Sequence, residues 1–190
     1  MKSILRPALV LFIALTVICC GLYPYAVSGI GQLAFADQAQ GSLVEHGGKT
    51  VGSSLIGQAF SSPKYFWGRP SATSPMPNNA SASSGSNQGS TNPALTDAVK
   101  GRVAALKAAD PGNVAAIPVD LVTASASGLD PEISIAAAYY QAGRIARERN
   151  LTVDAVRRMI DAHSQSRYFG IFGEPRVNVL VLNLALNQFN

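Results

Sequence analysis

One stretch of this chain is continuously apolar, and it lies close to the N-terminus. No charged residue occurs from Ala8 to Val27. A helix that rises about 1.5 Å per residue needs roughly 20 apolar residues to cross a hydrocarbon layer of about 30 Å. The pattern therefore predicts one transmembrane helix over residues 8–28, which separates residues 1–7 from residues 29–190.

The charges around this span predict its orientation. Lys2 and Arg6 precede the span, whereas the first charged residue after it is Asp37. Because cations collect on the cytoplasmic side of membrane helices, the N-terminus is expected in the cytoplasm and residues 29–190 outside it. The chain is then a single-pass protein of the cell (inner) membrane, in contact with the lipid bilayer.

Five residues at the ends of the span are predicted to anchor or pack it. Arg6 and Pro7 stand at its start. Tyr23 and Pro24 stand near its far end, where amphipathic rings favour the headgroup layer and a proline is tolerated close to a helix end. A small residue such as Gly21 lets a neighbouring helix approach closely.

A cleaved secretory signal is the alternative interpretation of the N-terminus. A basic start, an apolar core and Ala34-Phe35-Ala36 before Asp37 supply its three parts. The apolar core is too long for a signal peptide, and it lies too far from Ala36. Cleavage would leave a secreted or membrane-tethered binding protein or hydrolase, but the pattern favours an anchor.

The rest of the chain predicts a single small α+β domain, with helices packed on a short sheet. Two apolar runs around Gly47-Gly48 predict a β-hairpin. Pro118 argues against a central strand over residues 114–122. Residues 177–186 fit either a helix or a buried strand, and three asparagines favour the helix.

Three helices have clear starting signals. Asn92 caps a helix that Asp110-Pro111-Gly112 ends, and either Asp130-Pro131 or Ser134 caps a helix that reaches Arg149. Thr152 caps the third helix. The buried stripe of that third helix is expected to contain three apolar residues, namely Val153, Val156 and Ile160.

Residues 70–92 form a long polar loop in which no charged residue occurs. Serine, asparagine, glycine, proline and alanine make up nearly all of it. Such a segment buries little apolar surface to offset its ordering entropy, which predicts disorder. Long loops in compact domains are also often binding surfaces, and the sequence leaves both interpretations open.

The charge balance excludes nucleic acid as an expected partner. Lys2 and Arg6 belong to the cytoplasmic end, so 15 lysines and arginines less these two leave 13 against 11 acidic residues. Most of the remaining arginines interleave with acids at helical spacing, which predicts a solvated helix face. These arginines are Arg144, Arg147, Arg149, Arg157 and Arg158.

No catalytic residue or metal ligand is predicted. Cys19 and Cys20 are the only cysteines and lie inside the span, and His46 and His163 are far apart in the sequence. Ser61-Ser62-Pro63-Lys64 matches the spacing of Ser-x-x-Lys acylases. That chemistry needs both residues on one helical turn, whereas Pro63 lies in a stretch typical of a loop.

The aromatic run Tyr65-Phe66-Trp67 is typical of a core or interface anchor. It leads into residues that we expect to contact a partner, together with three from the polar loop. These are Trp67, Gly68, Arg69, Pro70, Ser71, Gly85, Ser86 and Asn87.

Several sequence blocks in order over the whole chain resemble the KdpC family, a subunit of the bacterial Kdp potassium-transporting ATPase. The blocks include Arg6-Pro7-Ala8, Gly21-Leu22-Tyr23-Pro24, Gly68-Arg69-Pro70-Ser71-Ala72, Gly85-Ser86-Asn87 and Val177-Asn178-Val179. The chain departs from the family at Ser84, where a second glycine is usual, and at Ile135 and Gly143, where proline is common. Ser84 puts in doubt a tight two-glycine turn in the polar loop.

The resemblance implies a non-catalytic accessory subunit of a complex. Its partners would be a channel-like potassium-binding subunit, a P-type ATPase subunit and a small membrane peptide. ATP and K⁺ would be handled by the complex, and the family is proposed to raise nucleotide affinity as a catalytic chaperone. The residues themselves indicate no nucleotide site, and the expected topology argues against direct contact with ATP.

Overall fold

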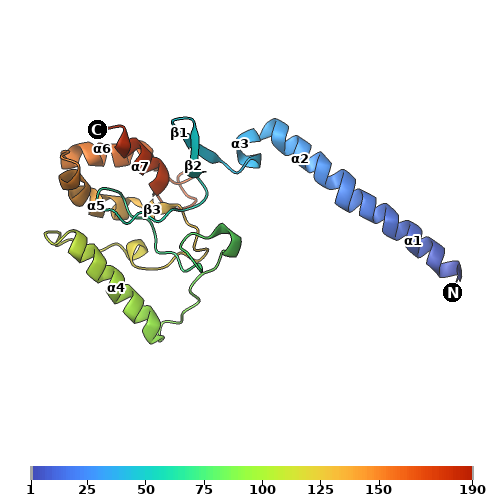
Figure 1. Cartoon of the computed structure of the whole chain (residues 1–190), viewed down its shortest axis with the longest axis horizontal. Coiled ribbons are helices and arrows are strands. Elements are labelled where there is room, and N and C mark those ends of the chain that lie inside the picture. The colour runs from blue at the N-terminus through green and yellow to red at the C-terminus, as the bar shows by residue number, and fades with distance from the viewer. Residues whose placement is uncertain (1, 190) are drawn as a thin grey trace. The chain divides into compact units, whose positions relative to one another are not determined.

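The computed structural model describes residues 2–189, and the chain divides into two compact units between Leu43 and Val44. The N-terminal unit is a long helix followed by a short one (Figure 1). Its elements are α1 (Lys2–Thr16), the π-helical segment η1 (Val17–Leu22), α2 (Tyr23–Ala34) and α3 (Ala36–Ala39).

The long helix has the length and composition needed to cross a membrane. It runs continuously for 31 residues from Ile4 to Ala34, and its most apolar window is not buried by the described part of the chain. At about 1.5 Å per residue it is about 46 Å long, which exceeds a hydrocarbon layer of about 30 Å. The helix thus extends beyond both ends of the predicted span, and the bounds 8–28 of that span stay a prediction.

Pro24, expected near a helix end, stands in the first turn of α2, but the helix runs continuously from η1 through the proline to Ala34. In a regular α-helix the ring of Pro24 would meet the carbonyl of Cys20, and proline has no N–H to donate. The wider π-helical turns of Val17–Leu22 lie just before it, and the Tyr23 N–H donates to the Ile18 carbonyl. The shifted hydrogen bonds let the apolar helix pass the proline instead of ending there.

The second unit contains two small sheets. The predicted hairpin is confirmed as β1 (Leu43–His46) and β2 (Lys49–Ser53), with Gly47-Gly48 at its turn. The other sheet has the order β3-β5-β4, all antiparallel. Its strands are β3 (Glu132–Ser134), β4 (Ser164–Gln165) and β5 (Arg176–Asn178).

Four α-helices of the second unit confirm the predicted mixture of helix and sheet. They are α4 (Pro93–Ala109), α5 (Ile135–Glu148), α6 (Val153–His163) and α7 (Val179–Asn187), with 3-10 turns at η2 (Ala80–Ala82) and η3 (Val119–Leu121). The side chains of Asn92, Ser134 and Thr152 cap α4, α5 and α6, as predicted. Residues 177–186 divide between a strand and a helix, because Asn178 ends β5 and caps α7.

The core lies between α5, α6, α7 and the three-stranded sheet. Val177 on the central strand β5 is fully buried and pairs with Ile133 on β3. Figure 1 shows α4 on the other side of the domain from α7, with irregular segments between them. The expected stripe of α6 is wrong at Val153, which is 39 % exposed, because the buried face is formed by Val156, Met159 and Ile160.

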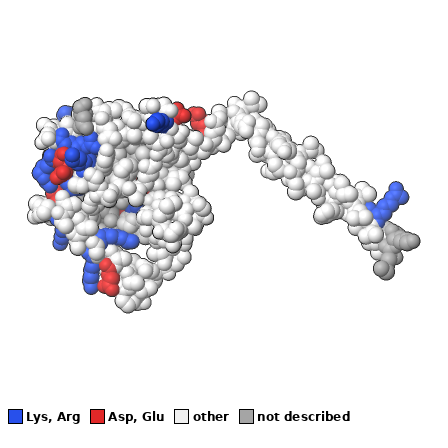
Figure 2. Space-filling model, in the orientation of Figure 1, with Lys and Arg blue, Asp and Glu red and all other residues white. Residues whose placement is uncertain are grey.

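The prediction of a solvated arginine face is wrong for Arg144, whereas Arg147 is exposed, with 58 % of its side chain accessible. Arg144 is only 2 % exposed. Arg147 pairs with Asp110 at 2.6 Å, and the Arg149 Nε donates to the Lys64 carbonyl at 2.9 Å. These partners lie far away in the sequence, so helical spacing alone could not identify them. Lysines and arginines do gather over the end of α5 and α6 in Figure 2.

Candidate functional site

An irregular segment, residues 61–71, is held in the domain by side chains of two helices. Asn183 on α7 accepts from the Phe66 N–H at 2.8 Å and donates to the Phe66 carbonyl at 3.0 Å. Gln141 on α5 accepts from the Trp67 N–H at 2.8 Å and donates to the Trp67 carbonyl at 3.1 Å. Each carboxamide supplies the pair of hydrogen bonds that a residue on a neighbouring strand would supply.

Arg144 strengthens the same attachment from within the core. Its guanidinium donates to the carbonyls of Pro63 and Tyr65 and to Gln141 Oε1, the last at 2.6 Å. It also lies 4.6 Å from the centre of the Trp67 ring. Burial lowers the pKa of Arg144 to about 10, so the group keeps its charge at neutral pH.

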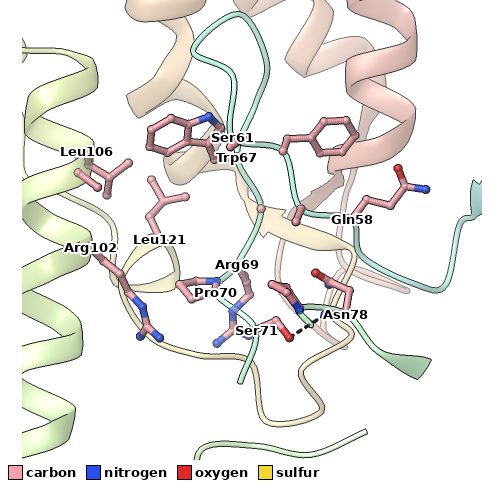
Figure 3. A pocket seen from close by; sticks show the side chains of 15 residues that line it. Gln58, Ser61, Trp67, Arg69, Pro70, Ser71, Asn78, Arg102, Leu106 and Leu121 are labelled. Atoms are coloured by element: carbon pink, nitrogen blue, oxygen red, sulfur yellow. Dashed lines mark hydrogen bonds between the residues drawn. The ribbon is translucent and has the colours of Figure 1, made fainter. Parts of the chain in front are cut away.

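The segment forms one wall of a pocket of about 320 Å³. Figure 3 shows the opposite wall, α4, with Arg102 and Leu106, while Leu121 lies between the two walls. The five predicted contact residues of the run 67–71 all line this pocket. They are Trp67, Gly68, Arg69, Pro70 and Ser71.

Two arginines give the pocket its charge. Arg69 Nη1 lies 3.0 Å from Asp130 Oδ2, and its buried Nε has no hydrogen-bond partner among residues 2–189. Arg102 donates to the Val122 carbonyl at 2.9 Å, and burial lowers its pKa. Both guanidinium groups thus fix loops of the domain while bordering an otherwise mainly apolar cavity.

The described lining of the pocket supplies no general base. The described residues that line it include no histidine, cysteine, aspartate or glutamate. Ser61 does line it, but residues 61–64 form an irregular segment, so Ser61 and Lys64 do not share the helical turn that acylase chemistry requires. Across residues 2–189 there is also no cluster of three or more metal-binding side chains.

The polar loop 70–92 is folded against residues 124–129. Ser71 Oγ donates to the Gly128 carbonyl at 2.7 Å and accepts from the Asn78 N–H at 2.9 Å (Figure 3). Further along, the Ser84 N–H donates to the Ser127 carbonyl at 3.0 Å. These hydrogen bonds stabilise the loop, although it buries little apolar surface. The predicted loop is therefore present and has a defined path.

The structure separates Gly85, Ser86 and Asn87 from the pocket, because none of them lines it. Gly85 lies against residue 126, where a Cβ atom would stand 2.7 Å from the Ala126 carbonyl oxygen. Ser86 and Asn87 are exposed. Ser84 fits without a second glycine, since its hydroxyl donates to the Gly85 carbonyl at 3.1 Å.

The predicted span residues all lie on the long helix. Arg6 and Pro7 belong to α1, Gly21 to η1, and Tyr23 and Pro24 to α2. No described atom outside the local helix lies within 4 Å of a Cβ built at Gly21. The glycine therefore leaves room for a close neighbour.

Gln141, Asn183 and Arg102 also shape the site, although the sequence pattern did not predict this role. Gln141 lies four residues after Ala137 and four before Ile145, both fully buried. A polar side chain on a buried helical stripe is a signal of an internal hydrogen-bond role. Asn183, between the buried Leu182 and Leu186, carries the same signal.

Fold and site together define a protein with one membrane-length helix and a small α+β domain, whose pocket has no general base among its described lining residues. The family model of KdpC, described as "K+-transporting ATPase, c chain", matches residues 5–188. The chain belongs to this family.

Curated relatives of the same family match the chain over nearly its full length. The chain is 72 % identical over 188 residues to the potassium-transporting ATPase KdpC subunit of Herminiimonas arsenicoxydans, covering 99 % of both chains. It is 72 % identical over 188 residues to that of Janthinobacterium sp. (strain Marseille), covering 99 % of this chain and 100 % of the relative. For Dechloromonas aromatica (strain RCB) the identity is 62 % over 188 residues, with 99 % and 98 % covered.

Proposed function

We propose that this chain is a non-catalytic accessory subunit of a high-affinity, ATP-driven potassium uptake complex. It stabilises the assembly of the channel-like potassium-binding subunit with the P-type ATPase subunit, which hydrolyses ATP. The match to the KdpC family over residues 5–188 carries this proposal. The pocket supports it, because its described lining residues supply contact surface without a general base.

The long helix is the part that we assign to the bilayer and to neighbouring helices. Most residues along this helix are exposed, so lipid, the channel-like subunit and the small membrane peptide can all contact it. Gly21 offers a face where another backbone can approach, and van der Waals packing drives helix association in lipid.

We place residues 29–190 outside the cytoplasm, since Lys2 and Arg6 precede the apolar stretch. Single cysteines test this placement in a variant in which Cys19 and Cys20 are replaced by alanine. A membrane-impermeant maleimide should label Ser90→Cys in intact spheroplasts and Ser3→Cys only after permeabilisation. The reverse pattern refutes the orientation, and a mature N-terminus at Asp37 refutes the anchor.

The role in the complex is tested by expressing the transporter with and without this chain, and then adding the gene back. Co-purification of the other subunits and potassium-stimulated ATP hydrolysis are measured. Loss of the complex supports assembly, whereas an intact complex with altered K⁺ or ATP dependence supports tuning of affinity. No change in either measurement refutes the proposed function.

The polar loop gives a narrower test of tuning. Ser86 and Asn87 are exposed and uncharged, so we assign them to a surface that K⁺ passes without being trapped. Replacing both with alanine should change the apparent potassium affinity of the assembled complex. An unchanged affinity in a complex of normal composition removes this part of the proposal.

A further inference from the structure

A short hairpin between β4 and β5 carries the most exposed group of large apolar side chains in the described part of the second unit. Tyr168, Phe169, Ile171 and Phe172 are 61 %, 94 %, 71 % and 62 % exposed. We call these four residues the aromatic tip. Neighbouring apolar residues exposed to this degree are typical of a surface that another molecule covers.

The aromatic tip is held in a defined hairpin by contacts at its base. Tyr168 and Phe172 exchange two backbone hydrogen bonds, both of 2.9 Å. Arg167 pairs with Glu174 across the base of the hairpin at 2.5 Å, and the Arg176 guanidinium lies 5.2 Å from the centre of the Tyr168 ring. A projection that is already ordered loses little conformational entropy when it docks.

A groove of about 590 Å³ continues from the base of the hairpin. Glu174, Pro175 and Arg176 form its edge beside the tip. Pro118 and Val119 line it further away, and Val119 is 69 % exposed. The tip and the groove together form one surface with a projection and an adjoining hollow, which suits a partner of complementary shape.

Most charges around this surface are paired within the domain, and the Asp120 carboxylate in the groove accepts hydrogen bonds from Ser134. Besides the Arg167–Glu174 pair, Arg176 Nε lies 2.7 Å from Glu132 Oε2. These two arginines and two glutamates leave no net charge at the base of the tip. An anionic bilayer surface attracts segments with an excess of lysine and arginine, so this neutral rim favours a protein partner.

We infer that the aromatic tip docks into an apolar pocket with a neutral rim on the extracytoplasmic side of another subunit of the same ATPase. The adjoining groove receives side chains of that subunit. The inference rests on the proposed function and names the surface through which the domain acts. Aromatic anchors of this kind commonly supply most of the binding energy of an interface.

A photoreactive phenylalanine analogue at position 169 tests the inference in the full complex. Irradiation should give an adduct between this chain and another subunit. An adduct with a second copy of this chain, or with lipid and no protein, overturns the inference. A wild-type chain that fails to co-purify with any ATPase subunit overturns the proposed function itself, which keeps the two failures distinct.

The double variant Phe169→Gly with Ile171→Ser gives an independent measurement. Phe169 has φ of 52°, which glycine adopts readily, so this change is compatible with the fold. The fraction of this chain that co-purifies with a tagged ATPase subunit should fall about tenfold. Val114→Ser is the control, because this side chain is 99 % exposed and lies outside the aromatic tip. It should leave the co-purified fraction within about twofold of the wild-type value. Equal retention of both variants, or equal loss, contradicts the inference.

Discussion

Asn183 holds both backbone groups of Phe66, a residue 117 positions earlier in the chain. Both residues are buried, and the Phe66 side chain is fully covered by the core. A buried N–H or carbonyl group without a partner is costly, so this single carboxamide allows an irregular segment to run through the domain interior. The pocket wall formed by residues 61–71 depends on it.

Replacing Asn183 with leucine, which has a similar size, should therefore destabilise the domain severely. The change leaves two buried backbone groups of Phe66 unpaired, and we expect a loss of about 3 kcal/mol in the free energy of unfolding. Urea unfolding of the full chain in detergent measures it. The control Asn187→Leu, at an exposed residue of the same helix, should cost less than about 1 kcal/mol. Similar losses in the two variants would contradict this role of Asn183.

The sequence predicted those elements whose signals are local. Asn92, Ser134 and Thr152 cap helices within three residues of themselves, and Gly47-Gly48 turns a hairpin between adjacent strands. Such signals depend only on the neighbouring backbone, so tertiary contacts do not change the local structure that they predict. The long apolar helix could also be predicted, because its length and composition are enough to identify it.

The site was only partly predictable because its contacts join distant segments. Trp67 was identified through its aromatic neighbours, yet Arg144, which covers its ring, was assigned to a solvated face. Its charge pattern with Glu148 is local, whereas its real partners are the carbonyls of Pro63 and Tyr65. Hydrogen bonds to backbone carbonyls carry no sequence signature, so a single sequence cannot reveal them.

Arg144 is expected to be among the most sensitive positions in the domain. Arg144→Met keeps much of the buried volume but removes the donors to the carbonyls of Pro63 and Tyr65 and the contact with the Trp67 ring. We expect a loss of about 3 kcal/mol, measured by urea unfolding. Arg158→Met, at an exposed residue of α6, is the matched control and should change stability by about 0.5 kcal/mol or less.

The effect of Arg144 should not depend on pH near neutrality. Burial lowers its pKa to about 10 in the fold, below the value of the unfolded chain. Both states are charged below pH 10, so the desolvation cost is then constant and is relieved only as the pH rises through the folded pKa. The stability difference between wild type and Arg144→Met should thus be equal at pH 6 and pH 9. A difference that changes across this interval would refute the assignment.

Gly143 offers a stabilising change. It lies inside α5, and no described atom outside the local helix backbone approaches within 4 Å of a Cβ built there. Because glycine in a helix interior is less favourable than alanine, Gly143→Ala should raise the free energy of unfolding by about 1 kcal/mol. Thermal unfolding followed by circular dichroism measures the gain, and a decrease would show that the position needs glycine for packing.

Gly85 should respond in the opposite sense, because the polar loop depends on close approach to residues 124–129. A Cβ atom at Gly85 would lie 2.7 Å from the Ala126 carbonyl oxygen, so Gly85→Ala must push the two backbones apart. We expect faster amide hydrogen exchange at Ser84 and faster proteolysis within residues 70–92. Gly89→Ala is the control, since no described atom lies within 4 Å of its Cβ position and its φ is not in the left-handed region. Wild-type exchange in Gly85→Ala, or equal acceleration in both variants, would show that this approach does not hold the loop.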